Sequence, residues 1–232
     1  MAQQNAMQLL VKWHIWLGWL VGVPIVMWLA SWLFMVIKPI EEVRGEHLRI
    51  SVAEAPLVIE GSAFATEDAQ LKDMRLTMQE GRAIAILATT DGVTTRVDYA
   101  TGEAIPPVDA EGARAIAAQR ILGGNDVTSV RFFEAEEVPF DFRRPRPVWQ
   151  VSLEDGTNVY IGRDTGEVEA VRTRWWRWFD FMWGLHIMDL SEREDTSHPI
   201  LIGFAALSLL GAIMGCILMF RRRKTRAKTA SS

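Results

Sequence analysis

Two long apolar runs, one near each end of the chain, enclose a polar central region. Residues 199–220 contain no charged side chain, and as a helix these 22 positions would span roughly 33 Å, enough to cross the hydrocarbon core of a membrane. Residues 13–37 are apolar apart from His14, Ser31 and a few glycines. We predict a transmembrane helix in each run. The first run is about twice as long as the apolar core of a signal peptide, which favours an uncleaved anchor over a cleaved leader.

Basic and aromatic residues at the ends of these runs predict the orientation of the chain. Residues 221–228 read RRRKTRAK, and positive residues beside a span stay in the cytoplasm. The tail at 221–232 is therefore predicted inside, and with two spans the N-terminal residues 1–12 are inside as well. Residues 40–174 then lie outside the cytoplasm, in a periplasm-like compartment. The segment 175–198 is predicted at the outer membrane interface, because six aromatic residues gather there: Trp175, Trp176, Trp178, Phe179, Phe181 and Trp183.

The central region contains an internal repeat of strand and turn signals. Asp-Gly occurs at 91–92 and 155–156, and Thr-Gly-Glu occurs at 101–103 and 165–167, both at an offset of 64 residues. Asp-Gly between alternating apolar runs is typical of a β-hairpin, and the second glycine suits a further turn. We predict two related α+β units, at about 50–105 and 109–170, each with a hairpin preceded by a helical or extended stretch.

A helix is predicted in the second unit, at residues 109–122, because this stretch has helical composition and ends at Gly123-Gly124. The fold class expected from these patterns is α+β. Two transmembrane helices flank an extracytoplasmic domain that is built from two repeats with antiparallel sheet.

Charge and composition exclude several classes of function. Residues 41–174 carry 15 Lys and Arg against 24 Asp and Glu, which argues against a nucleic-acid partner. The basic tail is expected to contact anionic lipid instead. The one cysteine, Cys216, lies in the second apolar run, so no disulfide or cysteine-based metal site can form within one chain. Motifs of serine hydrolases, zinc peptidases, P-loop enzymes and dinucleotide-binding enzymes are absent from the sequence.

Three segments together carry a resemblance to a known family. They are WHIWLGWLVGVPIVMWLASWLFM at 13–35, PVWQVSLEDGTNVYIGRDTGEV at 147–168 and WGLHIMDL at 183–190. In this order they resemble the opening helix, the end of the PepSY domain and the aromatic-x-Leu-His-x-x-Asp signature of PepSY-associated transmembrane proteins. The resemblance implies a bacterial inner-membrane protein, with both termini inside and a PepSY-like α+β domain in the periplasm.

The resemblance also implies a cofactor. Larger relatives are transmembrane electron carriers, including ferric-siderophore reductases, and hold haem b between histidines of different helices. His14, His186 and His198 are the candidate ligands of a haem iron, and the resemblance favours His186 among them. Met182 and Met188 are fallback ligands, although Met at such positions more often packs against lipid or the core. The present chain departs from these reductases, because it has two predicted spans where they have about four or more. A homodimer would restore a four-helix bundle.

Each histidine also has an interpretation without a cofactor. His14 would lie at the cytoplasmic headgroup boundary, His186 among interfacial aromatic residues and His198 at a helix start. His14 and His186 would lie at opposite membrane faces, about 30 Å apart, so one chain cannot clamp a single haem between them. Either His186 and His198 share a haem, or two copies of His14 share one in a dimer.

Two hypotheses of function therefore stay open, and the sequence does not decide whether the protein is an enzyme. The first is a haem-binding membrane protein that passes electrons towards the periplasm, with ferric iron as one acceptor. The second is a non-enzymatic anchored PepSY module that serves as an accessory subunit or binding partner of a larger complex. In that case the important surface lies on residues 41–174 and includes a protruding loop at 132–147.

Overall fold

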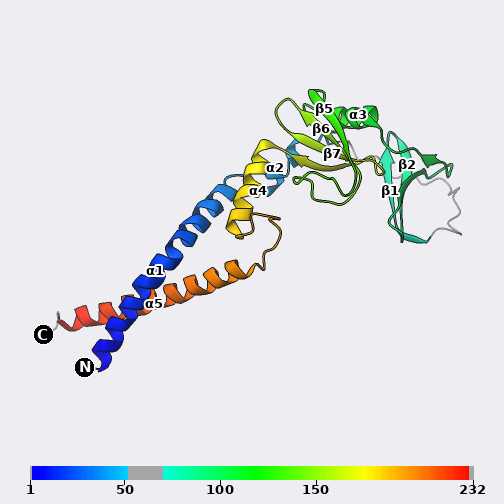
Figure 1. The fold of residues 1–232 in the computed structure, drawn as a ribbon. Coiled ribbons are helices and arrows are strands. Elements are labelled where there is room, and N and C mark those ends of the chain that lie inside the picture. The colour runs from blue at the N-terminus through cyan, green and yellow to red at the C-terminus, as the bar shows by residue number, and fades with distance from the viewer. Residues whose placement is uncertain (1, 52–69, 230–232) are drawn as a thin grey trace. The chain divides into compact units, whose positions relative to one another are not determined.

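The computed structural model describes residues 2–51 and 70–229, which fall into two compact units (Figure 1). The first unit combines the two ends of the chain, Met1–Pro39 and Trp178–Ser232. The second unit is the central region, Ile40–Arg177. This division follows the sequence pattern, because the apolar runs gather in the first unit and the repeated strand signals in the second.

The first unit is built on two long helices, α1 (Ala2–Met35) and α5 (Pro199–Thr229), which pack against each other. Both are long and apolar enough to cross a membrane, over Asn5–Met35 and Pro199–Arg221. Within the described residues only 11% and 6% of the positions in their apolar windows are buried, whereas the core helix of a soluble protein is mostly buried. α1 begins at Ala2 rather than at Trp13, because residues 2–12 are rich in Ala, Gln, Met and Leu, which favour helix.

The second unit consists of two four-stranded antiparallel sheets, which confirms the expected α+β layout with antiparallel sheet. The first sheet has the order β1-β2-β3-β4 and the second β5-β6-β7-β8. Their strands are β1 (Leu71–Gln79), β2 (Arg82–Thr89), β3 (Thr94–Asp98), β4 (Ala104–Ile105), β5 (Val127–Phe133), β6 (Val148–Leu153), β7 (Asn158–Gly162) and β8 (Val168–Arg172). Short helices precede them, α2 (Ile40–Val43) and the 3-10 helix η1 (Glu46–Leu48), and α3 (Ala110–Arg120) joins the sheets.

The two sheets pair their strands at the same offset that the sequence repeat shows. In the first sheet Ile84 pairs with Asp98, and 64 positions later Val148 pairs with Gly162 in the second. The turn glycines of both units need the left-handed backbone conformation that glycine adopts without strain. Their φ angles are 89° at Gly92, 81° at Gly156, 76° at Gly102 and 65° at Gly166. The helical or extended stretch predicted for the first repeat falls partly on 52–69, outside the described residues.

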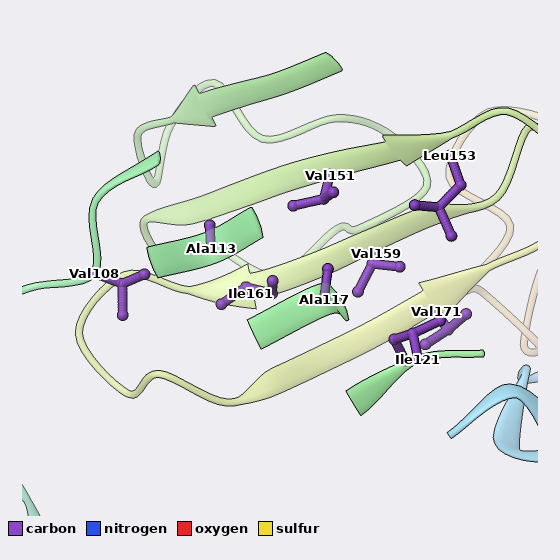
Figure 2. Close-up of a cluster of buried hydrophobic side chains, with 9 residues drawn as sticks. All are labelled: Val108, Ala113, Ala117, Ile121, Val151, Leu153, Val159, Ile161 and Val171. Carbon is purple, nitrogen blue, oxygen red and sulfur yellow. The ribbon is translucent and has the colours of Figure 1, made fainter. Parts of the chain in front are cut away.

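One face of the second sheet is buried against α3 (Figure 2). The Asp109 carboxylate caps this helix by accepting the backbone N–H of Gly112 at 2.7 Å. Ala113 and Ala117 face the sheet and are fully buried, because their small side chains let the helix approach closely. Alternate residues of β6, β7 and β8 complete this core: Val151, Leu153, Val159, Ile161 and Val171.

The other face of the second sheet is covered by the segment between β5 and β6. Phe142 from this segment is 2% exposed and stacks on Tyr160, with ring centroids 4.9 Å apart. The prediction of a protruding loop at 132–147 is therefore wrong in part. Phe132 and Phe133 belong to β5, and Phe142 fills a second apolar cluster, because this sheet alternates apolar side chains on both of its faces. Phe140, which is 48% exposed, remains outside that cluster.

Candidate functional site

The segment that contains His186 is helical and ends in a tightly bonded loop. Helix α4 (Arg174–His186) is closed by Met188, whose φ is 58°, and by the Asp189 N–H, which donates to the Gly184 carbonyl at 3.0 Å. These bonds turn the chain back at the end of the aromatic stretch. The aromatic segment expected at 175–198 is thus a helix followed by a structured loop, which leads into α5.

Asp189 holds the loop together. Its carboxylate is 6% exposed and accepts the hydroxyl of Ser191 at 2.8 Å. It also accepts four backbone N–H groups, those of Ser191, Glu192, Glu194 and Asp195. The Ser191 hydroxyl, and then these N–H groups, hold the pKa of Asp189 well below its usual value. Asp189 therefore stays ionised and serves the loop rather than the imidazole of His186.

An ion pair fastens the same loop to α4. Arg193 Nη1 lies 2.7 Å from Asp180 Oδ2, and these side chains are 20% and 7% exposed. The Trp183 indole donates to the Arg193 carbonyl at 3.1 Å. A Cβ on Gly184 would lie 2.6 Å from Arg193 Cγ, so the arginine can cross α4 there because the residue is glycine. The two acidic residues that flank His186 in sequence are thus both used to shape the loop.

His186 is bound by three residues of α1. Its Nδ1 lies 3.0 Å from the hydroxyl of Ser31, which is 1% exposed. The Trp28 indole donates to the His186 carbonyl at 2.8 Å. The ring of Trp32 lies beside the imidazole, with centroids 5.8 Å apart. Nothing in the sequence pattern pointed to these partners, because Ser31 stood out only as a polar interruption of an apolar run.

These bonds favour the tautomer of His186 that carries its proton on Nδ1. The Ser31 hydroxyl donates to the Trp28 carbonyl at 3.0 Å, so its single hydrogen is used there. His186 Nδ1–H then donates to Ser31 Oγ, and Nε2 carries the lone pair. No hydrogen bond to Nε2 is found among the residues that the structure describes. Burial lowers the pKa of His186, which favours the neutral form. A neutral imidazole that is fixed through Nδ1 and bare at Nε2 is arranged as a metal ligand.

His14 lies elsewhere in the first unit, in the contact between α1 and α5. A Cβ on Gly215 would lie 3.1 Å from His14 Cε1, so the imidazole packs on the glycine surface of α5. Its Nδ1 is buried and has no hydrogen-bond partner among the described residues. The 17 residues from His14 to Ser31 correspond to about 25 Å of helix. The structure therefore does not bring His14 and His186 of one chain together.

His198 directly precedes α5, and its carbonyl accepts the N–H of Ile202 at 3.1 Å. Its Nδ1 is buried without a hydrogen-bond partner within the described part of the chain. Because His186 and His198 are the two ends of the loop that Asp189 and Arg193 close, the pair stays the candidate for a shared haem within one chain. The described residues also contain no group of three or more His, Cys, Asp and Glu placed to hold a metal ion.

Comparison of the chain with family models, with curated proteins and with solved structures finds no match. The functional assignment therefore depends on the geometry around His186 and on the resemblance carried by the sequence segments.

Proposed function

We propose that this chain is a two-span protein of the bacterial inner membrane, of the PepSY-associated transmembrane type, that carries haem b for electron transfer. The observation that carries the proposal is the imidazole of His186, fixed through Nδ1 by Ser31 with its Nε2 available. In this proposal His186 and His198, at the two ends of the same loop, are the residues that would hold the haem iron. When bound, the haem iron would supply one-electron exchange between its ferric and ferrous states.

The residues around His186 have separate tasks in this proposal. Ser31 sets the tautomer and the ring orientation, as outer hydrogen-bond partners of ligating histidines do. Trp28 fixes the end of α4 by binding the His186 carbonyl, and Trp32 packs on the ring. Burial favours the neutral imidazole at neutral pH. The sequence contains no flavin or nicotinamide motif, so the electron donor is a separate molecule.

The orientation in the membrane is supported by the charges at the helix ends. The basic run at 221–228 favours a cytoplasmic C-terminus, and two spans then place the N-terminus inside and the second unit in the periplasm. A second copy of the chain would supply two further helices. Gly18 and Gly22 on α1 border an apolar groove of about 640 Å³, and no atom of the described residues lies within 4 Å of a Cβ built at either position. Such a groove suits close approach of another helix.

The first experiment is an absorption spectrum of detergent-purified protein, oxidised and then dithionite-reduced, with a pyridine haemochrome assay. We expect sharp reduced α and β bands that are lost in His186→Ala. Ser31→Ala should weaken haem retention by about 10- to 100-fold, because an outer hydrogen bond to the ligand is lost. His47→Ala is the matched control, since His47 lies in η1 of the second unit and should leave the spectrum unchanged. A featureless spectrum from protein expressed with ample haem would overturn the proposal.

A second candidate is a non-enzymatic, membrane-anchored PepSY module that acts as an accessory subunit or binding partner. The open groove at Gly18 and Gly22 also favours this function, because it can receive a helix of another membrane protein. The same spectrum separates the two candidates. An accessory subunit is colourless, and its His186→Ala variant enters the same assembly, as native mass spectrometry from detergent would show.

A further inference from the structure

A cavity of about 300 Å³ lies inside the second unit, between the first sheet and α3. One wall is apolar and includes Ile84, Ile105 and Ile116. Arginine side chains from both repeats also line the cavity, among them Arg96 from β3 and Arg120 from the end of α3. The site therefore combines an apolar surface with positive charge, and it lies in a different unit from His186 and its partners.

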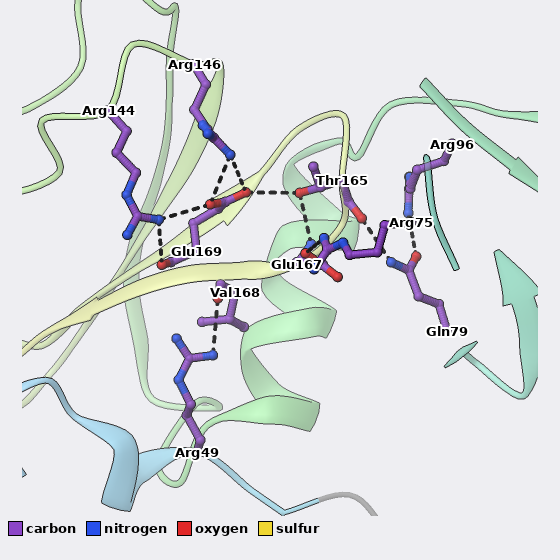
Figure 3. A network of polar contacts seen from close by, with 10 residues as sticks. All are labelled: Arg49, Arg75, Gln79, Arg96, Arg144, Arg146, Thr165, Glu167, Val168 and Glu169. Atoms are coloured by element: carbon purple, nitrogen blue, oxygen red, sulfur yellow. Dashed lines mark hydrogen bonds and ion pairs between the residues drawn. The ribbon is translucent and has the colours of Figure 1, made fainter. Parts of the chain in front are cut away.

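Arg96 reaches into the junction between the repeats, where it contacts Gln79 (Figure 3) and, among the described residues, no carboxylate. Nη1 donates to Gln79 Oε1 at 3.2 Å, and Nη2 donates to the Pro106 carbonyl at 2.8 Å. Nε is buried and has no hydrogen-bond partner among the described residues. Both partners of the guanidinium are neutral, so its charge is not compensated by direct contact. Burial lowers the pKa of Arg96, against the smaller effects of the charges on Asp164 and Glu80.

Arg120 adds a second charge of the same kind. Within residues 2–51 and 70–229 its guanidinium makes no hydrogen bond or ion pair. It lines the 300 Å³ cavity and also a neighbouring one of about 360 Å³ on the other side of Gln79 and Gly166.

The acidic residues of the cavity wall are engaged elsewhere. Asp109 caps α3 by accepting the N–H of Gly112. Glu80 lies 3.9 Å from Arg82, which also lies 3.8 Å from Asp98. Among the described residues, two arginines without a direct carboxylate contact thus face a space bordered by isoleucine side chains.

We propose that this cavity binds a small organic carboxylate, with the carboxylate held by Arg96 and Arg120 and the carbon skeleton against Ile84, Ile105 and Ile116. The planar guanidinium matches a carboxylate through paired, charge-assisted hydrogen bonds. The apolar wall favours a ligand with a carbon skeleton over an inorganic anion. At about 30 Å³ for each water, a cavity of 300 Å³ has room for a molecule of roughly ten non-hydrogen atoms.

The test is isothermal titration calorimetry of the full-length protein in detergent, with succinate and citrate as probes and neutral succinamide as the uncharged analogue of succinate. We expect saturable binding of at least one carboxylate and at least tenfold weaker binding of succinamide, because the analogue lacks the charge. Arg120→Gln should weaken binding of the carboxylate by about tenfold or more, since one charge-assisted hydrogen-bonded partner is lost. Arg96→Gln should weaken it to a similar or larger extent.

Arg114→Gln is the matched control, because Arg114 lies on the same helix, is exposed and does not line the cavity. It should bind the carboxylate as the unchanged protein does. Arg120→Gln keeps the test decisive if Arg96→Gln fails to fold, because the Arg120 side chain makes no hydrogen bond or ion pair with the part of the chain that the structure describes. The proposal is overturned if neither carboxylate binds saturably at concentrations up to about 10 mM, or if Arg120→Gln binds as tightly as Arg114→Gln.

Discussion

Tyr160 is a buried residue whose hydroxyl lies at the centre of a polar cluster on the second sheet. The hydroxyl donates to Asp141 and accepts from Gln150 Nε2 at 2.6 Å. Asn158 Nδ2 lies 3.3 Å from the other oxygen of Asp141. Burial, followed by the hydrogen bond to Asp141, raises the pKa of Tyr160 above its usual value. The folded protein therefore keeps the Tyr160 phenol in its neutral form.

This raised pKa predicts a loss of stability in alkali. Above about pH 10 the unfolded chain ionises at Tyr160 while the folded chain does not, so the free energy of unfolding falls as pH rises. At neutral pH, Tyr160→Phe should lower the free energy of unfolding by about 1–3 kcal/mol, because Asp141 and Gln150 lose a hydrogen-bond partner. The difference in free energy of unfolding between the unchanged protein and Tyr160→Phe should shrink above about pH 10. Urea unfolding at several pH values measures the free energy of unfolding of both proteins. Tyr99→Phe, at the other tyrosine, is the control. A constant gap across this range contradicts the assignment.

At the scale of single residues the sequence indicates candidates but not their partners. His186 is selected by its place in the aromatic segment and by the family resemblance. The hydrogen bond from its imidazole joins residues 155 positions apart, and no local pattern predicts which polar residue of α1 it meets. The same holds for Arg96, whose partner Gln79 lies on a different strand. Side-chain partners of this kind depend on tertiary packing. The spacing of apolar residues, with a period of 2 in strands and 3.6 in helices, predicts elements but not these partners.

At the scale of elements, the sequence predicts the sheets better than the long helices. The hairpins follow from glycines that need positive φ, a local requirement that is visible as Asp-Gly and Thr-Gly-Glu. Helix α1 extends beyond the predicted span at 13–37 to Ala2, because residues 2–12 contain no helix breaker. Burial of Phe142 was missed because the charges around it suggested a solvated loop, while the sheet beneath it still needed an apolar cover.

The contact between α1 and α5 gives a prediction at this scale. Gly215 lies against His14, and Gly211 lies against Leu17, where a Cβ would meet Cδ2 at 3.4 Å. Gly215→Leu should separate the helices and lower the thermal unfolding midpoint in detergent, because the new side chain occupies the space of the imidazole. Gly203→Leu is the control: it lies on the same helix, no atom lies near its Cβ position, and its midpoint should stay unchanged. Equal midpoints for both variants would show that the helices do not depend on this contact.

At the scale of the whole molecule, apolar and charged residues are divided between the two units. The candidate spans expose large apolar side chains such as Trp19 (81%), Val23 (77%) and Leu209 (63%), which water would solvate poorly. The second unit instead has its own buried core and carries most of the acidic residues. A membrane around α1 and α5 accounts for both observations, and the basic run at 221–228 favours an insertion with the C-terminus inside.

This direction can be tested by labelling single cysteines in intact spheroplasts. In a Cys216→Ser background, Val93→Cys places a thiol in the turn between β2 and β3, where Val93 is 54% exposed. A membrane-impermeant maleimide should label this site without lysis, because the proposed topology puts the second unit in the periplasm. Ala227→Cys, in the basic tail, should be labelled only after lysis, because six positive charges favour a cytoplasmic location of the tail. Labelling of Ala227→Cys before lysis and of Val93→Cys only after lysis would show that the topology is the reverse of the proposed one. The His186 loop would then face the cytoplasm, and a haem held there would exchange electrons with cytoplasmic partners.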